Sequence, residues 1–126
     1  MRLLLDTHVV LWIGEGGRQL NPKAYAILAD PMNDRIVSHV SLWEFAIKRS
    51  VGKFTISERE IDRALDDMVA EELPIARHHV QAVAALPFHH RDPFDRLLIA
   101  QAKAEDLIVA TRDRSFAAYG IRILPA

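Results

Sequence analysis

The stretch Leu3-Leu4-Leu5-Asp6-Thr7-His8 is a short apolar run that ends at an acid, and similar runs recur along the chain. Residues 35–40 lead to Ser41, and residues 107–111 lead to Arg112-Asp113. Weaker runs lie at 73–76 and 121–124. Short runs of branched apolar residues with polar boundaries are typical of buried strands. The sequence therefore predicts five strands.

Helical patterns fill the gaps between these runs. Pro22 follows Asn21 and suits the first position of a helix that continues toward Ala29. Ser57 and Glu60 have the spacing of a capping box, and an apolar helix face follows through Val69. Residues 79–86 and 93–105 are also helical in pattern. Alternating strands and helices predict an α/β fold, a three-layer α/β/α sandwich with a mostly parallel sheet.

Composition narrows the class of protein. With 126 residues, half of them apolar, the chain fits one domain spanning 1–126. The net charge of −1 excludes a basic electrostatic field over the whole surface. The absence of Cys excludes disulfides and thiolate chemistry. The sequence contains no apolar run of membrane-spanning length, and an acid at position 6 is too early for a signal peptide. We expect a cytoplasmic protein with no membrane partner.

Acidic residues gather where the predicted strands end. Asp6 follows the first strand, Glu44 lies shortly after the second and Asp113 follows the fourth, while Asp92 and Asp95 open the helix before the fourth. Ligands of open parallel sheets bind beyond these carboxyl ends. Carboxylates meeting there repel one another unless a hard cation such as Mg²⁺ joins them. Such a site can activate water against a phosphodiester.

Helix capping is the competing interpretation of the same acids. Glu44 with Ser41 fits a capping box, Asp92 fits an N-cap before Pro93, and Asp113 fits the cap of a short helix. Asp6 is different, because a lone charge at the tip of an apolar strand is costly to bury without a partner. From spacing alone, both interpretations stay open.

Four segments in order resemble the PIN-domain family, and most closely the VapC-type toxin ribonucleases of type II toxin–antitoxin pairs. The similarity runs from Leu3 to the C-terminus. The segments are Leu3-Leu4-Leu5-Asp6-Thr7-His8, Ser41-Leu42-Trp43-Glu44, residues 92–102 (Asp-Pro-Phe-Asp-Arg-Leu-Leu-Ile-Ala-Gln-Ala) and residues 108–113 (Ile-Val-Ala-Thr-Arg-Asp).

The resemblance implies an endoribonuclease that uses Mg²⁺, or Mn²⁺, and hydrolyses RNA with a metal-activated water. It implies the catalytic acids Asp6, Glu44, Asp95 and Asp113, with Asp6 and Asp95 as metal ligands. Asp95 is preferred to Asp92 because it directly precedes the Leu-Leu-Ile-Ala run. It also implies a cognate antitoxin protein as partner, and apolar helix surfaces beside the site suggest a homodimer or an antitoxin groove.

Other functions remain as alternatives. The family also allows a non-toxin nuclease of RNA processing, or an inactive RNA- or protein-binding module. A haloacid-dehalogenase-like hydrolase needs a second Asp two residues after the first, where His8 stands. A phosphoacceptor receiver domain needs a Lys near the last strand, which the segment Thr111-Arg112-Asp113 lacks.

The remaining polar residues have weaker assignments. Thr7 and Thr111 are candidate hydrogen-bond donors to the neighbouring acids. His90 could line the pocket rim, but a solvated turn is the preferred interpretation, and convergence of the two His pairs on zinc is disfavoured. Trp12 and Trp43 are expected in the core or an interface. Cations that could contact RNA phosphates are Lys48, Arg49, Arg91, Arg96, Arg112 and Arg114.

Overall fold

A computed structural model describes all 126 residues, and its sheet contains five strands in the order β3-β2-β1-β4-β5. Every neighbouring pair of strands is parallel, so the predicted α/β class is confirmed and the sheet is parallel throughout. Leu4 of β1 lies opposite Ile36 on one side and Val109 on the other. The strands are β1 (Arg2–Leu5), β2 (Asp34–Ser38), β3 (Glu71–Leu73), β4 (Ile108–Thr111) and β5 (Ile123–Pro125).

Local capping signals set where several helices begin. The capping box of Ser57 and Glu60 forms at the start of α4, and Asp92 caps α6 with Pro93 in the first turn. Asn21 caps α2 by accepting from the Ala24 N–H. The helices are α1 (Thr7–Gly14), α2 (Pro22–Ala29), α3 (His39–Ser50), α4 (Glu58–Asp67), α5 (Arg77–Val83), α6 (Pro93–Glu105) and the 3₁₀ helix η1 (Arg114–Tyr119).

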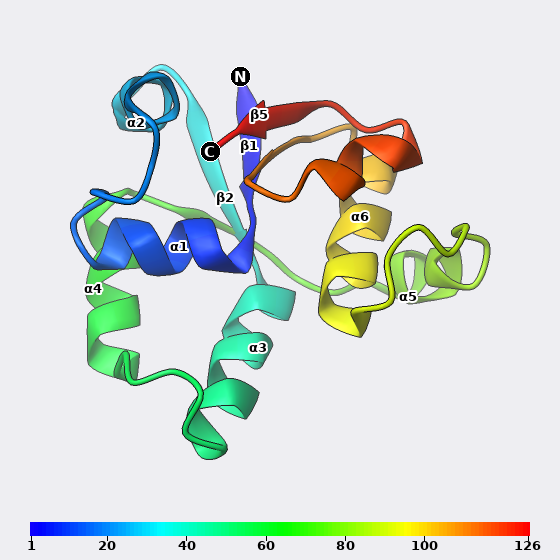
Figure 1. The fold of residues 1–126 in the computed structure, drawn as a ribbon, viewed down its shortest axis with the longest axis horizontal. Coiled ribbons are helices and arrows are strands. Elements are labelled where there is room, and N and C mark those ends of the chain that lie inside the picture. The colour runs from blue at the N-terminus through cyan, green and yellow to red at the C-terminus, as the bar shows by residue number, and fades with distance from the viewer.

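Helices cover both faces of the sheet (Figure 1). Successive side chains of a strand point to opposite faces, so Leu3 and Leu5 of β1 pack with α1, α2 and α4. Leu4 lies in the second core cluster, which includes residues of α6 and η1. All three leucines are fully buried. A strand that is apolar on both faces therefore forms the centre of a three-layer sandwich.

Several boundaries differ from the sequence prediction. The helix expected at 79–86 is α5 at Arg77–Val83, α4 ends at Asp67 before Val69, and the last strand is Ile123–Pro125, not 121–124. Ser38, not Ser41, caps α3, because its side chain accepts from the Val40 N–H at 2.9 Å and ends β2 at that residue. The capping interpretation of Ser41 with Glu44 is therefore wrong, and both residues lie inside the helix. Strand β3 (Glu71–Leu73) ends at Leu73, which pairs with Ser38, so it shares only that residue with the predicted run 73–76.

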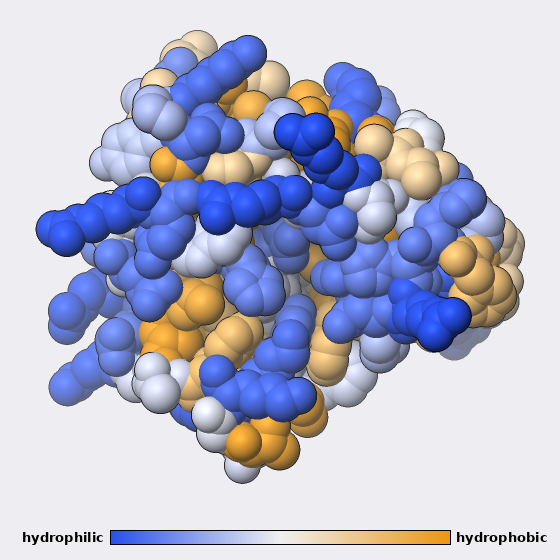
Figure 2. All heavy atoms as spheres, in the orientation of Figure 1, coloured by the Kyte–Doolittle hydropathy of each residue, from blue (hydrophilic) through white to orange (hydrophobic).

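The order of the strands places β1 between β2 and β4, and the chain leaves each of the three at the same edge of the sheet. Helices α1 and α3 begin there, as does η1. This edge is where parallel sheets bind ligands. Hydrophilic side chains cover much of the face in Figure 2, with hydrophobic patches between them. No helix combines the length and the apolar character that crossing a bilayer requires.

Candidate active site

A pocket of about 400 Å³ opens at the carboxyl edge of the sheet, and acidic side chains dominate its lining. The structure brings together there all four acids predicted from the sequence, with Asp92 beside them. The lining residues are Asp6, His8, Trp12, Glu44, Lys48, His90, Asp92, Asp95, Arg112 and Asp113.

Asp6 is buried at the end of β1 and retains one oxygen for a ligand. Its backbone N–H donates to the Ala110 carbonyl at 3.0 Å, which fixes it against β4. The Thr111 hydroxyl donates to Oδ2 at 2.7 Å, whereas no side chain donates to Oδ1. Burial raises the pKa of Asp6 above its ordinary value, although the Thr111 hydrogen bond opposes this. A cation at Oδ1 would compensate the buried charge.

Glu44 differs from Asp6 because protein donors occupy both of its oxygens. The Thr7 hydroxyl donates to Oε1 at 2.7 Å, and Lys48 Nζ donates to Oε2 at 2.5 Å from one helical turn away. These bonds explain how a carboxylate only 3% exposed is tolerated. Burial works to lower the pKa of Lys48, but the hydrogen bond and charge of Glu44 outweigh it and raise the pKa. Lys48 therefore stays positive inside an acidic pocket.

Asp95 points into the pocket from the first turn of α6, while Asp92 caps that helix. Asp92 Oδ1 accepts from the Asp95 N–H at 3.0 Å, as the capping interpretation predicts. Burial, followed by the charge of Asp6 and then those of the other three acids, raises the pKa of Asp95 to about 8. Without a cation, Asp95 is therefore mostly protonated at neutral pH.

Asp113 has a capping role as well as a place in the pocket. Its Oδ1 accepts from the backbone N–H and the hydroxyl of Ser115, at 2.9 and 2.6 Å. Burial works to raise the pKa of Asp113, but the hydrogen bonds from Ser115 and His90 outweigh it and hold the pKa below the ordinary value. The cap predicted for this residue is present, and its second oxygen faces the pocket.

His90 is the residue that the sequence analysis placed wrongly. Its Nε2 lies 2.9 Å from Asp113 Oδ2 and 3.0 Å from Asp95 Oδ2, and its side chain is only 17% exposed. A solvated turn residue would not bridge two acids. The adjacent segment Arg91-Asp92 was the only local signal, and the contact to Asp113 spans 23 residues of sequence.

The side chains present fit a hard divalent cation. Asp6 and Asp95 offer carboxylate oxygens, the ligands that Mg²⁺ and Mn²⁺ prefer. Asp95 also forms a group with His90 and Asp113 whose potential ligand atoms lie within 4.8 Å of one another, and Asp6 lies outside that group. The mutual repulsion that raises the pKa of Asp95 is what a cation would remove. The site is therefore chemically suited to the cation that the resemblance implies.

Only two of the six cations proposed for RNA line the pocket, namely Lys48 and Arg112. Arg96 is buried and serves the fold instead, because its guanidinium donates to four backbone carbonyls between residues 83 and 90. Arg112 lies over the Trp12 ring at 4.2 Å, so Trp12 forms part of the pocket wall. Trp43 is 51% exposed and packs edge-on against Phe94.

The two His pairs form separate clusters and do not converge on one metal. His79 is buried, and its Nδ1 accepts from the Ala76 N–H at 2.9 Å. The proton therefore resides on Nε2, which lies 2.8 Å from Glu105. Hydrogen bonds from His79 and His78 lower the pKa of Glu105. This cluster is explained as a hydrogen-bonded contact between α5 and α6.

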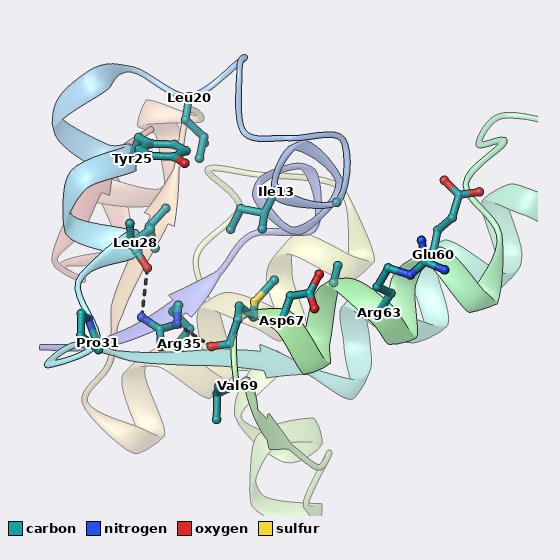
Figure 3. A pocket seen from close by; sticks show the side chains of 14 residues that line it. Ile13, Leu20, Tyr25, Leu28, Pro31, Arg35, Glu60, Arg63, Asp67 and Val69 are labelled. Carbon is teal, nitrogen blue, oxygen red and sulfur yellow. Dashed lines mark hydrogen bonds between the residues drawn. The ribbon is translucent and has the colours of Figure 1, made fainter.

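A larger and more apolar cavity, of about 600 Å³, lies away from the acids between α1, α2 and α4 (Figure 3). Leu28 and Ile13 contribute to its apolar lining, and Glu60, Arg63 and Asp67 lie along the α4 side. Arg35 is fixed by the carbonyls of Leu28 and Met68 at 3.0 and 2.7 Å. The cavity has a largely apolar lining and one charged side, and we call it the α1/α2/α4 groove.

Fold and site together define an α/β domain with a carboxylate pocket at the edge of a parallel sheet. The sequence model of the PIN domain family matches residues 3–121. The chain therefore belongs to the PIN domain family. No curated protein matches the chain significantly.

Solved structures support the same fold. A chain from VapBC2 of Rickettsia felis bound to a promoter DNA fragment aligns with a TM-score of 0.71 at 16% identity, covering 99% of this chain and 98% of that chain. A chain from VapBC-5 of Mycobacterium tuberculosis aligns with a TM-score of 0.65 at 23% identity, covering 99% of this chain and 98% of that chain. A chain of a toxin–antitoxin complex from Klebsiella pneumoniae aligns with a TM-score of 0.67 at 18% identity, covering 98% of each chain.

Proposed function

We propose that this PIN domain is a divalent-cation-dependent endoribonuclease and the toxin of a toxin–antitoxin pair. The observation that carries the proposal is the meeting of Asp6, Glu44, Asp95 and Asp113 in one pocket. These acids come from four separate segments of the chain. Capping explains Asp113 in part, but it explains neither the buried Asp6 nor the raised pKa of Asp95.

Each acid has a distinct role in this proposal. Asp6 and Asp95 would hold the cation, because each has an oxygen that no protein donor fully occupies. Glu44 is fixed by Thr7 and Lys48, which suits it to orient water as an acceptor. A bound Mg²⁺ supplies a more acidic water and stabilises negative charge on a phosphoryl group.

The substrate is proposed to be RNA, bound by cations at the pocket itself. Because the net charge is −1, attraction of a polyanion has to be local. Lys48 and Arg112 line the acidic pocket, and His8 is exposed beside Asp6. Contacts from such side chains to phosphates add affinity without reading sequence.

The decisive experiment compares cleavage of a labelled single-stranded RNA by wild type, Asp6→Asn and Asp95→Asn, with Mg²⁺ and with a chelator. Removing either ligand is expected to reduce cleavage by about 100-fold or more, because a metal contributes several kcal/mol of transition-state stabilisation. Asp62→Asn, on the exposed face of α4, is the matched control and should cleave as wild type. Undiminished cleavage by both pocket variants would refute the nuclease assignment.

The toxin role has its own test, which separates it from a nuclease of RNA processing. Expression of the wild-type chain should arrest bacterial growth, while Asp6→Asn at the same soluble level should not. Co-expression of the neighbouring gene should relieve the arrest. Unaffected growth despite RNA cleavage in vitro would favour the RNA-processing alternative.

We place the antitoxin in the α1/α2/α4 groove. Its apolar lining and its charged side suit an amphipathic segment. The similar structures include toxin–antitoxin complexes, which supports a protein partner for this chain. The homodimer expected from the sequence stays a prediction. Its candidate surface is the face of α3 that carries Trp43 and Ile47 and continues to the C-cap residue Val51, all three of which are exposed at one-turn spacing.

A further inference from the structure

His90 is held in the acidic pocket by contacts on several sides. Its backbone N–H donates to the Tyr119 hydroxyl at 2.8 Å, and its ring packs edge-on against Phe116. The Asp92 N–H donates to His90 Nδ1 at 3.1 Å. The side chain is therefore positioned by the fold, independently of the two acids that it contacts.

The contact with Asp92 also determines which ring nitrogen carries the proton. Because Nδ1 accepts a hydrogen bond, Nε2 must be protonated and is a donor. Nε2–H donates to Asp113 Oδ2 at 2.9 Å, and Asp95 Oδ2 lies 3.0 Å from the same nitrogen. To ligate a metal through Nε2, the ring would have to move its proton to Nδ1, where the Asp92 N–H already points.

The Nε2–H donor therefore occupies the point where a cation could contact both carboxylates. The ligand atoms that His90, Asp95 and Asp113 offer lie within 4.8 Å of one another, close to the span that one divalent ion with oxygen distances of about 2.1 Å can bridge. A proton aimed at that point excludes a cation from it. Asp95 Oδ1 accepts no side-chain hydrogen bond and would remain for the ion that we propose Asp6 and Asp95 hold, whereas both oxygens of Asp113 are engaged by Ser115 and His90.

We propose that His90 is a positioning residue that takes the place of a second ion, so that the centre binds a single divalent cation and Asp113 stays outside its ligand shell. This inference rests on the proposed function, since it concerns the stoichiometry of that site. The substitution of His90 would free two carboxylate oxygens. A second cation would then bind between Asp95 and Asp113.

Two substitutions separate the functions of the ring nitrogens. His90→Gln can place an amide N–H near Nε2 and so retains a donor to the acids. His90→Asn can accept from the Asp92 N–H but is too short to reach both carboxylates. His89→Asn is the matched control, because His89 is exposed and its ring packs edge-on against Tyr119. Thermal unfolding of each variant checks that it is folded.

The readout is Mn²⁺ bound per chain, measured from the loss of the free-ion signal in electron paramagnetic resonance. We expect one ion for wild type, His89→Asn and His90→Gln, and two for His90→Asn. Pulsed resonance of the wild type should show no coupling to an imidazole nitrogen.

Three outcomes would overturn the inference. Equal stoichiometry in wild type and His90→Asn refutes the exclusion of a second ion, and nitrogen coupling in the wild type makes His90 a ligand instead. Both results leave the proposed nuclease intact. A wild-type chain that binds no Mn²⁺ refutes the cation requirement of the proposed function, and this inference with it.

Discussion

The Thr111 hydroxyl donates a 2.7 Å hydrogen bond to Oδ2 of Asp6, across 105 residues of sequence. It joins the end of β4 to the end of β1, the two central strands whose carboxyl ends form the pocket edge. Because this bond engages one oxygen of Asp6, it determines which oxygen remains for a ligand. Loss of a donor that orients a metal ligand typically costs about 10- to 100-fold in metal affinity.

Thr111→Val is expected to weaken Mg²⁺ or Mn²⁺ binding by about tenfold, because Asp6 loses its orienting donor. The Asp113 N–H also loses its acceptor, so the free energy of unfolding should fall by about 1–3 kcal/mol. Calorimetric titration and urea unfolding measure the two effects. Thr55→Val, at an exposed position, is the control, and unchanged affinity in Thr111→Val would contradict the orienting role.

The raised pKa of Asp95 predicts opposite pH effects on stability and on metal binding. Between its ordinary value of 3.8 and about 8, the folded protein retains a proton that the unfolded chain has lost. The contribution of Asp95 to metal-free stability is therefore complete below pH 4 and is lost as pH rises through 8. Urea unfolding at a series of pH values should show this decline, and Asp95→Asn should lack it.

Cation affinity should follow the reverse trend, because a ligand carboxyl must lose its proton to bind. We expect Mg²⁺ affinity to rise by about tenfold per pH unit from pH 5 to 7 and to level off above pH 8. Calorimetry in buffers of different ionisation enthalpy should detect the released proton. A pH-independent affinity over this range would show that Asp95 is already ionised without the metal.

Arg96→Lys is expected to destabilise the protein by about 3 kcal/mol, measured by urea unfolding. The guanidinium holds the carbonyls of Val83, Leu86, Pro87 and His90, and an ammonium cannot reach them all at once. Arg114→Lys, on an exposed side chain, should leave stability unchanged. Equal stability of the two variants would show that the carbonyls find other donors.

Val69→Asp is expected to weaken antitoxin binding by about 100-fold or more, because it places a charge in the α1/α2/α4 groove. Val69 is 79% exposed, so the fold should tolerate the change. Val80→Asp, which alters an exposed valine on α5, should bind as wild type. Surface plasmon resonance with the co-expressed partner measures both, and cation binding should not change in either variant.

Elements with strong local signals were predictable in detail. The helix expected at 93–105 is α6, Pro93–Glu105, because Asp92 and Pro93 define its first turn locally. The first residue of α3 was not predictable, since Ser38 and Ser41 are both good N-caps by residue type. The choice between them depends on where β2 stops pairing, which sequence spacing does not contain.

The candidate site also combines features that local sequence predicts with features that depend on tertiary contacts. Sheet topology predicted that acids after the strands could meet at one edge, whereas the choice of Asp6, Glu44, Asp95 and Asp113 as the catalytic set came from the family resemblance. The engagement of Glu44 by Lys48 could be anticipated only as an i, i+4 pair on a helix. His90 was misplaced and Arg96 was assigned to RNA, because both depend on loop geometry between α5 and α6.

The sequence by itself determined the order of strands and helices, the apolar centre of the sheet and the acids that follow its strands, because periodicity and capping act over a few residues. Only the tertiary structure decided which oxygen of each acid is free, which cation faces the pocket and that His90 bridges Asp95 and Asp113. Those properties depend on burial and on hydrogen-bond donors that the fold brings together from distant segments. The free energy of a charged side chain is set by these surroundings, which local sequence does not specify.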